Sequence, residues 1–463
     1  MKRNILYAIV FALAVSMALP FARKSSAAGE STNVRHTIIA ATGDAAPGGG
    51  TYLSLRNATL NAQHEVAFDA SVSGPPFSPG VFLGDGRTTA TVTLGQVSNP
   101  FITSNGEVVY DVNNIDTFRS DGKTIVPLVR DGDPVQGGGT LTPLSRDVND
   151  FGVLTYVAII SGSTATQGIF RTDGTDTLAI ARDDITPPTG GIFTLLGDPV
   201  INDRGQVTFY SVMEGGSAEF GIFRGEGADL TPVFVANQIA PGGATFADFS
   251  NPVINKHGKI ATVASLTNSA SHDGLFVGDG TNLVAIALEG QPAPAGGIFK
   301  DPRNRSTFPA PFRLNDQGEV AFDAFMTGGT SNNGIFRGDG QRTTTIALAG
   351  TTAPGTTGTF SSFGDIKLLN DGRVAFIASL TVGVGGVNTS NNLGIWIGKS
   401  DADLQLIART GDVIGGKVLT RLPQSDFLSH LFDINENGVL WVGTFGPAKA
   451  VVYSRIPGNS EVQ

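Results

Sequence analysis

The octapeptide NDQGEVAF occupies residues 315–322, and variants of it recur along the chain at intervals of about fifty residues. NDRGQVTF occupies residues 202–209, NKHGKIA residues 255–261 and NAQHEVAF residues 61–68. A second phrase follows each of them, as in GVFLGDG from Gly80, GIFRGEG from Gly221 and GIFRGDG from Gly334. A third phrase, rich in Ala, Pro and Gly, closes the unit, as in IALEGQPAPAGGIF from Ile286. Self-similarity at a fixed period predicts stacked copies of one supersecondary unit.

Each unit has the pattern of short β-strands joined by tight turns. Residues 65–72 and 319–325 alternate and are rich in Val and Phe, which favours strands. Asp-Gly pairs between two apolar runs favour hairpins, because the tight turn needs positive φ. Asn and Gly three residues apart mark a second turn, in which the Asn side chain bonds its own backbone. The predicted structural turn residues are Asn61, Asn202, Gly205, Asn255, Gly258, Asn315, Gly318, Asp85, Gly86, Asp279, Gly280, Asp339 and Gly340.

The order of the phrases predicts a closed ring. The chain begins with a third phrase, IIAATGDAAPGGG from Ile38, and stops just after a second phrase, AVVYS from Ala450, so the two partial units complete one another. A solenoid needs distinct polar caps at both ends instead. About eight units of four short strands predict an all-β fold, a β-propeller closed by the N-terminal strand, over residues 38–453. A β-solenoid is the alternative fold.

The N-terminus has the pattern of an export signal. Lys2 and Arg3 precede an apolar run over residues 5–19, and small residues follow at 26–28. This pattern predicts a signal peptide over residues 1–28 and export to the periplasm or the cell exterior, with a short linker over residues 29–37. An uncleaved membrane anchor is the alternative, because Arg23 and Lys24 follow the apolar run. Residues 454–463 form a polar tail without a second apolar span.

Composition narrows the classes of partner. Gly makes up 61 of 463 residues, hydrophobic residues 40% and charged residues 16%, which is typical of a folded, loop-rich β protein. There is no Cys, so no disulfide supports the fold. The formal net charge is −10, and without residues 1–28, which hold four basic residues, it is 27 minus 41, or −14. An acidic protein of this kind is unsuited to nucleic acid, and we expect a monomer.

The repeat phrases resemble a bacterial tandem-repeat family named for the pattern asparagine-x-x-glycine-x-x-alanine-phenylalanine. Asn315, Gly318, Ala321 and Phe322 fit the pattern in full, and Asn202, Gly205 and Phe209 fit it with Thr208 in the Ala position. The resemblance covers residues 38–453 and implies an exported surface protein. Many members carry C-terminal anchoring signals, and this chain departs from them by having none. The resemblance implies no activity.

Side chains that could carry chemistry are few. The acids of the GDG turns recur in most units, so we interpret them as turn residues, with calcium binding at some turns as the alternative. We therefore expect no cofactor and no metal. His64 stands where other repeats have Gly and His257 lies within NKHG, and we expect both to be solvated turn residues. HExxH, GxSxG and Cys–His patterns do not occur in the sequence, so it supports no enzyme class by motif.

Function should lie where the repeats differ. In a propeller, the loops between blades share one face with the loops that precede each GIF phrase, and two longer departures stand out at residues 300–313 and 418–432. The first adds basic residues to an acidic protein and could bind an acidic sugar or a carboxylate. The predicted binding residues are Lys300, Arg303, Arg305, Phe308, Arg313, Arg421, Asp426 and His430.

Three functions remain open at this point. The favoured one is an exported, non-catalytic propeller that binds a glycan, an envelope component or a protein. The second is a polysaccharide hydrolase or lyase, which needs a carboxylate pair or a Tyr–His–Arg set at one mouth of the channel. The third is a structural or assembly protein of the cell envelope.

Overall fold

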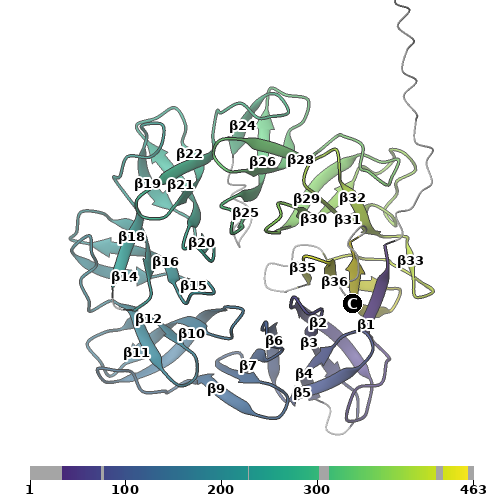
Figure 1. Ribbon diagram of the computed structural model, residues 1–463, viewed down its shortest axis with the longest axis horizontal. Coiled ribbons are helices and arrows are strands. Elements are labelled where there is room, and N and C mark those ends of the chain that lie inside the picture. The colour runs from purple at the N-terminus through teal and green to yellow at the C-terminus, as the bar shows by residue number, and fades with distance from the viewer. Residues whose placement is uncertain (1–33, 75–77, 228, 302–311, 424–430, 457–463) are drawn as a thin grey trace, which may run out of the picture. The chain divides into compact units, whose positions relative to one another are not determined.

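The computed structural model describes residues 34–74, 78–227, 229–301, 312–423 and 431–456. The chain divides into two units, Met1–Ser31 and Thr32–Gln463, and every described residue belongs to the second. Within that unit, antiparallel sheets of four or five strands are arranged in a ring of eight blades (Figure 1). The prediction of an eight-bladed β-propeller is confirmed, and the alternative of a β-solenoid is wrong. None of the described residues forms a helix that is long and apolar enough to cross a membrane.

Blades 1 to 4 follow one another along the chain, each beginning at the centre of the ring. Blade 1 comprises β2 (Tyr52–Leu60), β3 (Val66–Val72), β4 (Ser78–Gly84) and β5 (Thr89–Leu94). Blade 2 comprises β6 (Val97–Ile102), β7 (Val108–Val112), β8 (Asp116–Ser120) and β9 (Ile125–Val129). Blade 3 comprises β10 (Thr140–Val148), β11 (Leu154–Ser161), β12 (Gln167–Thr172) and β13 (Thr177–Arg182). Blade 4 comprises β14 (Ile192–Leu196), β15 (Val200–Ile201), β16 (Val207–Glu214), β17 (Phe220–Gly225) and β18 (Leu230–Val235).

Blades 5 to 7 repeat the pattern, and blade 8 uses both ends of the chain. Blade 5 comprises β19 (Thr245–Phe249), β20 (Val253–Ile254), β21 (Ile260–Thr267), β22 (Asp273–Gly278) and β23 (Leu283–Leu288). Blade 6 comprises β24 (Ile298–Asp301), β25 (Phe312–Leu314), β26 (Val320–Thr327), β27 (Asn333–Gly338) and β28 (Thr343–Leu348). Blade 7 comprises β29 (Phe360–Leu368), β30 (Val374–Leu380), β31 (Leu393–Gly398) and β32 (Gln405–Arg409). Blade 8 comprises β35 (Phe432–Asn435), β36 (Gly438–Phe445), β37 (Ala448–Arg455) and β1 (His36–Ala41), and a hairpin of β33 (Val413–Ile414) and β34 (Lys417–Val418) precedes it.

The N-terminal strand closes the ring, as the order of the phrases predicts. Strand β1 pairs antiparallel with β37, from His36 opposite Ser454 to Ala41 opposite Ala450. The paired residues begin two positions before Ile38, and β37 runs two positions beyond Tyr453. Because β1 is the outermost strand of a blade whose other strands come from the C-terminal end, the two ends of the described chain hold blade 8 together.

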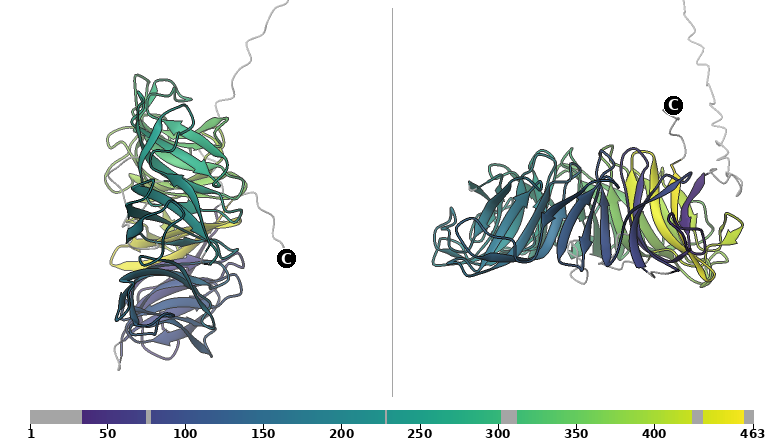
Figure 2. Two further views of the ribbon diagram at one scale, coloured as in Figure 1. Left: turned by 90° about the vertical axis from the view of Figure 1, so that its left-hand side faces the viewer. Right: turned by 90° about the horizontal axis from the view of Figure 1, so that it is seen from below.

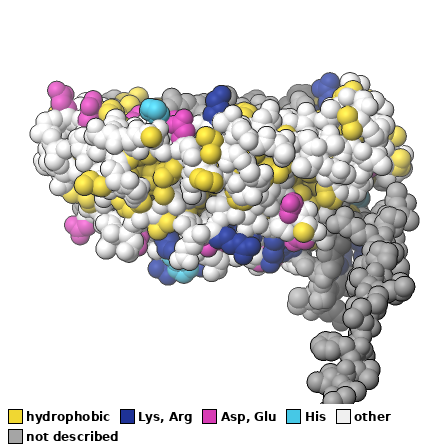
Figure 3. All heavy atoms as spheres, turned by 90° about the horizontal axis from the view of Figure 1, so that it is seen from above, with side chains coloured by type: hydrophobic (Ala, Val, Ile, Leu, Met, Phe, Trp, Pro, Cys, Tyr) yellow, Lys and Arg dark blue, Asp and Glu magenta, His cyan; other side chains and the backbone are white. Residues whose placement is uncertain are grey.

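The hydrophobic core lies between neighbouring blades. One cluster joins Ala261 and Leu275 of blade 5 to Phe299 and Phe322 of blade 6. The last Phe of the first repeat phrase is therefore a core residue, and Phe322 packs its ring against Phe299 and Phe336. On the face seen in Figure 3, hydrophobic side chains lie mainly on the wall of the ring, whereas most charged side chains lie toward its two rims.

The strands of each blade run between two rims (Figure 2). Because successive strands are antiparallel, the NxxG turn and the GDG turn of each blade lie at the same rim, which we call the turn rim. The opposite rim carries the loops between blades and the loops before each GIF phrase, and we call it the loop rim.

Most blades break the pairing of their innermost strand near its middle. The ladder shifts register between Leu55 and Ala58, between Ser98 and Phe101, and between Phe363 and Ile366. In blades 4 and 5 the break is wider, so that residues 197–199 separate β14 from β15 and residues 250–252 separate β19 from β20. We call these positions the inner bulges. A β-bulge re-aims side chains and is frequent beside functional sites.

Candidate functional site

In six of the eight repeat turns, an Asn residue joins its blade to the next one. The Asn202 Oδ1 accepts the backbone N–H groups of Arg204 and Gln206 at 3.1 and 2.9 Å. Its Nδ2 donates to the carbonyl oxygen of Asn255, the equivalent residue of the next blade, at 2.8 Å. The same inter-blade bond runs from Asn61 to Thr103, Asn149 to Asn202, Asn255 to Asn315, Asn315 to Leu369 and Asn435 to Asn61. We call these six asparagines the Asn belt, and because all are buried, their polar atoms are used within the scaffold.

An arginine of the third strand supplies a second inter-blade bond. Arg171 Nη1 donates to the carbonyl oxygen of Gly205 in the next repeat turn, at 2.7 Å. The equivalent bonds join Arg119 to Gly152, Arg224 to Gly258 and Arg337 to Gly372. The glycines accommodate both a positive φ and the close guanidinium, since a Cβ on Gly205 would lie 2.6 Å from Arg171 Nη1. These arginines are therefore scaffold residues.

The acids of the GDG turns cap their own hairpins. Asp339 Oδ1 accepts the backbone N–H groups of Gln341 and Arg342, both at 2.8 Å, and Asp85 does the same for Arg87 and Thr88. The N–H of Arg342 lowers the pKa of Asp339, and the N–H of Thr88 lowers that of Asp85, because both stabilise the charged form. Within the described ranges, no three His, Asp or Glu side chains are placed to hold a metal ion.

The first predicted binding segment interrupts an innermost strand. Residues 302–311 lie between β24 and β25, which both pair with β26. Arg303, Arg305 and Phe308 lie outside the described residues. Lys300 is exposed on β24, and Arg313 on β25 brings its Nη2 to 3.1 Å from Asp365 Oδ1 of blade 7.

The second predicted segment leads into the innermost strand of blade 8. Arg421 forms a backbone bridge with Thr444, whereas Asp426 and His430 lie outside the described residues. Both segments therefore connect to innermost strands at their described ends.

A polar network follows the inner bulges of blades 1 and 2 and reaches Arg146 on β10 of blade 3. Arg56 Nε lies 2.9 Å from Asp69 Oδ2, and Asp69 Oδ1 accepts the N–H of Asn57 at 2.7 Å. The Asp69 side chain is buried, and burial raises its pKa even though Arg56 favours the charged form. The Arg56 side chain remains 47% exposed. The ion pair therefore fixes a guanidinium that solvent can reach.

The network continues into blades 2 and 3 through the side-chain amide and the backbone carbonyl of Asn99. Asn57 Nδ2 donates to Asn99 Oδ1 at 3.2 Å, and Asn99 Nδ2 donates to Asp111 Oδ2 at 3.0 Å. Arg146 Nε lies 2.5 Å from Asp111 Oδ1, and its Nη2 donates to the carbonyl oxygen of Asn99 at 3.1 Å. Asn99 holds a φ of +52°, a conformation that Asn tolerates better than most residues. We call the set Arg56, Asn57, Asp69, Asn99, Asp111 and Arg146 the inner-wall network.

Three carboxylates act on Asp150 near the turn rim. The surrounding protein raises the pKa of Asp150 to about 6, and Asp203, Asp433 and Asp316 add to the rise by repulsion. Asp203 Oδ1 accepts the N–H of Asp150 at 3.1 Å, so it stands beside it. These residues come from blades 3, 4, 6 and 8, and we call them the acidic mouth.

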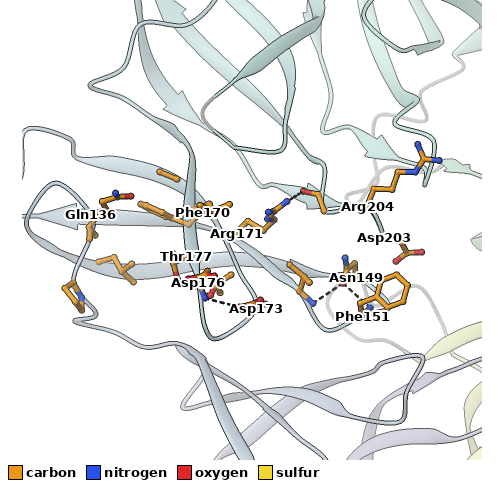
Figure 4. A pocket seen from close by; sticks show the side chains of 18 residues that line it. Gln136, Asn149, Phe151, Phe170, Arg171, Asp173, Asp176, Thr177, Asp203 and Arg204 are labelled. Carbon is orange, nitrogen blue, oxygen red and sulfur yellow. Dashed lines mark hydrogen bonds between the residues drawn. The ribbon is translucent and has the colours of Figure 1, made fainter.

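A groove of about 890 Å³ runs along blade 3 to the acidic mouth (Figure 4). Gln136 lies at one end, and Asn149, Phe151 and Asp203 lie at the other, with Arg204 beyond them. Phe151 is 59% exposed. The groove therefore places an aromatic ring beside a carboxylate, although Asn149 is already used by the Asn belt.

The seam between blade 8 and blade 1 departs from the other seams. Tyr453 on β37 holds the position of Arg224 on β17, and His64 holds the position of Gly258. The Tyr453 hydroxyl lies 3.1 Å from His64 Nδ1, and His64 has a φ of +68°. The expectation of a solvated turn residue is wrong for His64, which is half-buried against its neighbour blade, whereas His257 is exposed.

Sequence reasoning missed the inner bulges and the inter-blade arginines. Ser-Asn-Pro at residues 98–100 and 250–252, and Gly-Asp-Pro at 197–199, recur shortly before the repeat turn and could have marked the bulges. The Arg of GIFR recurs at 171, 224 and 337. Its partner lies in the next repeat, so one unit alone does not reveal the bond.

Residues 82–438 match the model of a family described as "Family of unknown function (DUF7453)". The chain belongs to this family. No curated protein sequence matches it.

The chain is similar to several solved structures at low sequence identity. The β-propeller domain of the Trilobed protease from Pyrococcus furiosus is 12% identical, with 77% of this chain and 98% of that chain covered and a TM-score of 0.41. A puromycin-hydrolyzing peptidase of Mycobacterium tuberculosis is 12% identical, with 84% of this chain and 57% of that chain covered and a TM-score of 0.43. The Dos1 propeller is 9% identical, with 90% of this chain and 95% of that chain covered and a TM-score of 0.41.

Proposed function

We propose that this protein is an exported, non-catalytic β-propeller that binds a glycan at the inner-wall network. The observation that carries the proposal is the Arg56 guanidinium, held by the buried Asp69 and 47% exposed. Guanidinium and amide groups donate several hydrogen bonds in fixed geometry, which suits sugar hydroxyls and carboxylates. Side chains that already hold one another lose little freedom on binding.

Export and the wider repeat family belong to the same proposal. The signal-like residues 1–28 and the acidic remainder support export. The repeat phrases support membership of the NxxGxxAF repeat proteins as well, because the Asn and Gly of that pattern hold the blades together.

A hydrolase is the second candidate, favoured by the acidic mouth. A glycosidase needs one carboxyl of raised pKa near an ionised one, and Asp150 beside Asp203 meets the first requirement. A lyase has weaker support. Burial raises the pKa of Tyr453 to about 12, whereas a tyrosine base works best with a lowered pKa.

The test is a thermal-shift screen of the chain from Gly29 against neutral and uronate-containing polysaccharides. A ligand at a hundred times its dissociation constant stabilises the native state by about 2.7 kcal/mol. We expect one sugar class to shift the melting temperature of the wild type and of Arg87→Lys, but to act much less on Arg56→Lys. Arg87 is the matched control, because it is exposed in the GDG turn of blade 1.

Three other outcomes would contradict the proposed site or favour another function. A shift that is equal in Arg56→Lys and wild type contradicts the site. Release of sugar fragments that stops in Asp150→Asn favours the hydrolase. The absence of any shift contradicts glycan binding and favours a protein partner or a structural role in the envelope.

A further inference from the structure

Two of the five histidines lie where the ends of the chain meet. His36 on β1 stands opposite Ser454 of β37. His64 lies in the repeat turn of blade 1 and faces Tyr453 and Asn435 of blade 8. His64 therefore lies in the seam between blades 8 and 1. His36 lies on the β1–β37 pairing within blade 8, with its ring edge-on to Trp441 at 6.3 Å. Both side chains belong to the region where distant parts of the chain close the ring.

The surroundings of His64 require an unprotonated Nδ1. Asn435 Oδ1 accepts the N–H groups of Asn437 and Gly438, and its Nδ2 donates to the carbonyl oxygen of Asn61, all at 2.9 Å. The amide orientation is thus fixed, and Nδ2 presents its other hydrogen 3.3 Å from His64 Nδ1. With the Tyr453 hydroxyl at 3.1 Å, Nδ1 is an acceptor, so the proton of neutral His64 is on Nε2. Asn437 Nδ2 lies 3.4 Å from that Nε2, and because both groups are then donors, this contact is not a hydrogen bond in the neutral form.

A proton on His64 Nδ1 would oppose the amide that closes the Asn belt. The new N–H would point at one hydrogen of Asn435 Nδ2, and the other hydrogen of the same Nδ2 bonds the carbonyl oxygen of Asn61 across the seam. Burial and the charge of Arg455 lower the pKa of His64. The acids nearby have other partners, since Glu65 Oε2 accepts from Asn61 at 2.8 Å and Glu436 lies 3.2 Å from Arg373 Nη2.

His36 is also held as an acceptor. Trp441 Nε1 donates to Ser454 Oγ at 2.7 Å, and because an indole only donates, the Ser454 hydroxyl is free to donate to His36 Nδ1 at 2.8 Å. Ser454 is fully buried. If Nδ1 were protonated, the serine would receive two N–H groups and its own hydrogen would lose its acceptor. Burial lowers the pKa of His36, and the charges beside it on β1 and β37 are Arg35 and Arg455.

We propose that closure of the ring is pH-sensitive: protonation of His36 weakens the β1–β37 pairing within blade 8, and protonation of His64 weakens the Asn435–Asn61 bond between blades 8 and 1, so that the ring opens there on acidification while the other blades stay closed. The proposal does not depend on the ligand of the inner wall.

The sign of the effect follows from the two histidines. Each pKa is lowered from 6.5 in the folded state, so their contribution to stability is present above about pH 6.5 and is lost as the pH falls below it. Asp147 and Asp150, whose pKa values are raised to about 6, act in the opposite direction. A melting curve against pH mixes both effects, and the test must therefore report on β1 itself.

The experiment is hydrogen exchange of the β1 amides at about pH 7.5 and about pH 5, corrected for intrinsic exchange. The test variant is His36→Gln/His64→Asn, which keeps an acceptor at both sites, does not titrate in this range, and places at position 64 a residue that tolerates positive φ. His257→Gln/His272→Gln is the control, because both of those histidines are exposed.

We expect the opening of β1 to rise several-fold on acidification in the wild type and in the control variant, and not in the test variant, with β12 of blade 3 unchanged throughout. Equal rises in wild type and test variant, no rise in the wild type, or a rise in every blade would overturn the proposal. An NMR titration of the wild type is the second measurement, should the test variant fail to fold. Imidazole midpoints below 6.5 for both His36 and His64 support the proposal, and a midpoint at or above 6.5 for either contradicts it.

Discussion

In each of several blades, the inner bulge interrupts the innermost strand and the repeat turn follows the end of that strand. The polar side chains of the two regions nevertheless have different roles. In the turn, Asn202 Oδ1 accepts a backbone N–H of the same turn, and its Nδ2 donates to the carbonyl oxygen of Asn255 in the next blade. In the bulge, Arg56 is anchored by Asp69 and still exposes 47% of its side chain. The asparagines that recur in six of the eight repeat turns join neighbouring blades, whereas Arg56 of the bulge remains accessible to solvent.

The largest effect on the free energy of unfolding is expected from replacing the Phe that ends the repeat phrase. Phe322→Ala should lower the free energy of unfolding by roughly 3–5 kcal/mol, because a buried ring between two blades leaves a cavity. Phe322 is 1% exposed and packs on Phe299 and Phe336. Denaturant unfolding measures the change, and a loss below about 1 kcal/mol would contradict the placement of the core between blades.

The Asn belt gives the next largest effect. Asn202→Ala should lower the free energy of unfolding by about 2–4 kcal/mol, since the N–H groups of Arg204 and Gln206 lose their acceptor and the bond to Asn255 is lost. Asn105→Ala is the control, because Asn105 is exposed and stands outside the belt. Equal losses in the two variants would show that the inter-blade bond contributes little.

Replacing Asp150, a residue of the blade 3 repeat turn that varies between units, should stabilise the protein, whereas Asn202→Ala should destabilise it. The folded protein raises the pKa of Asp150 to about 6, so its charge destabilises the native state above that pH. Asp150→Asn should therefore be more stable than wild type at about pH 8, by up to about 1 kcal/mol because solvent screens the exposed group. The difference should shrink as the pH falls through about 6 and vanish below about 4. A variant that is less stable than wild type at about pH 8 would contradict this electrostatic account.

The smallest effect on stability is expected in the bulge. Arg56→Lys keeps a cation beside Asp69 and should change the free energy of unfolding by less than about 1 kcal/mol. The planar fork of donors is lost, so affinity for the sugar found in the screen should fall about tenfold or more. Calorimetric titration of Arg56→Lys and Arg87→Lys separates the two quantities. A large loss of stability with unchanged affinity would make the inner-wall network a scaffold element like the Asn belt.

The sequence predicts features that lie within one repeat unit, but it does not reveal the bonds that join different units. The phrase NxxGxVAF marks strand, turn and core within one unit, and the partial units at Ile38 and Ala450 reveal the closure. The Asn belt and the Arg171–Gly205 bond join separate units, so their partners appear only when the blades are placed side by side. His64 and Tyr453 are visible as single departures from the repeat, but only the closed ring pairs them.

The inner-wall network could not be predicted for a related reason. Asp69 and Asp111 follow a Phe and a Tyr in strands whose other positions are core residues, and nothing in the local pattern pairs them with Arg56 or Arg146. The breaks in the innermost strands bring these side chains together, and the positions of the breaks depend on the pairing between strands.

The most direct test of the central claim is a hydrogen-exchange footprint of the protein with the sugar that gives the largest thermal shift. The account predicts that this sugar protects backbone amides at the inner bulges around Arg56, Asn57 and Asn99 and leaves the repeat turns at Asn202 and Asn255 unchanged. Protection confined to the turn rim or to the outer strands, with none at the bulges, would contradict it.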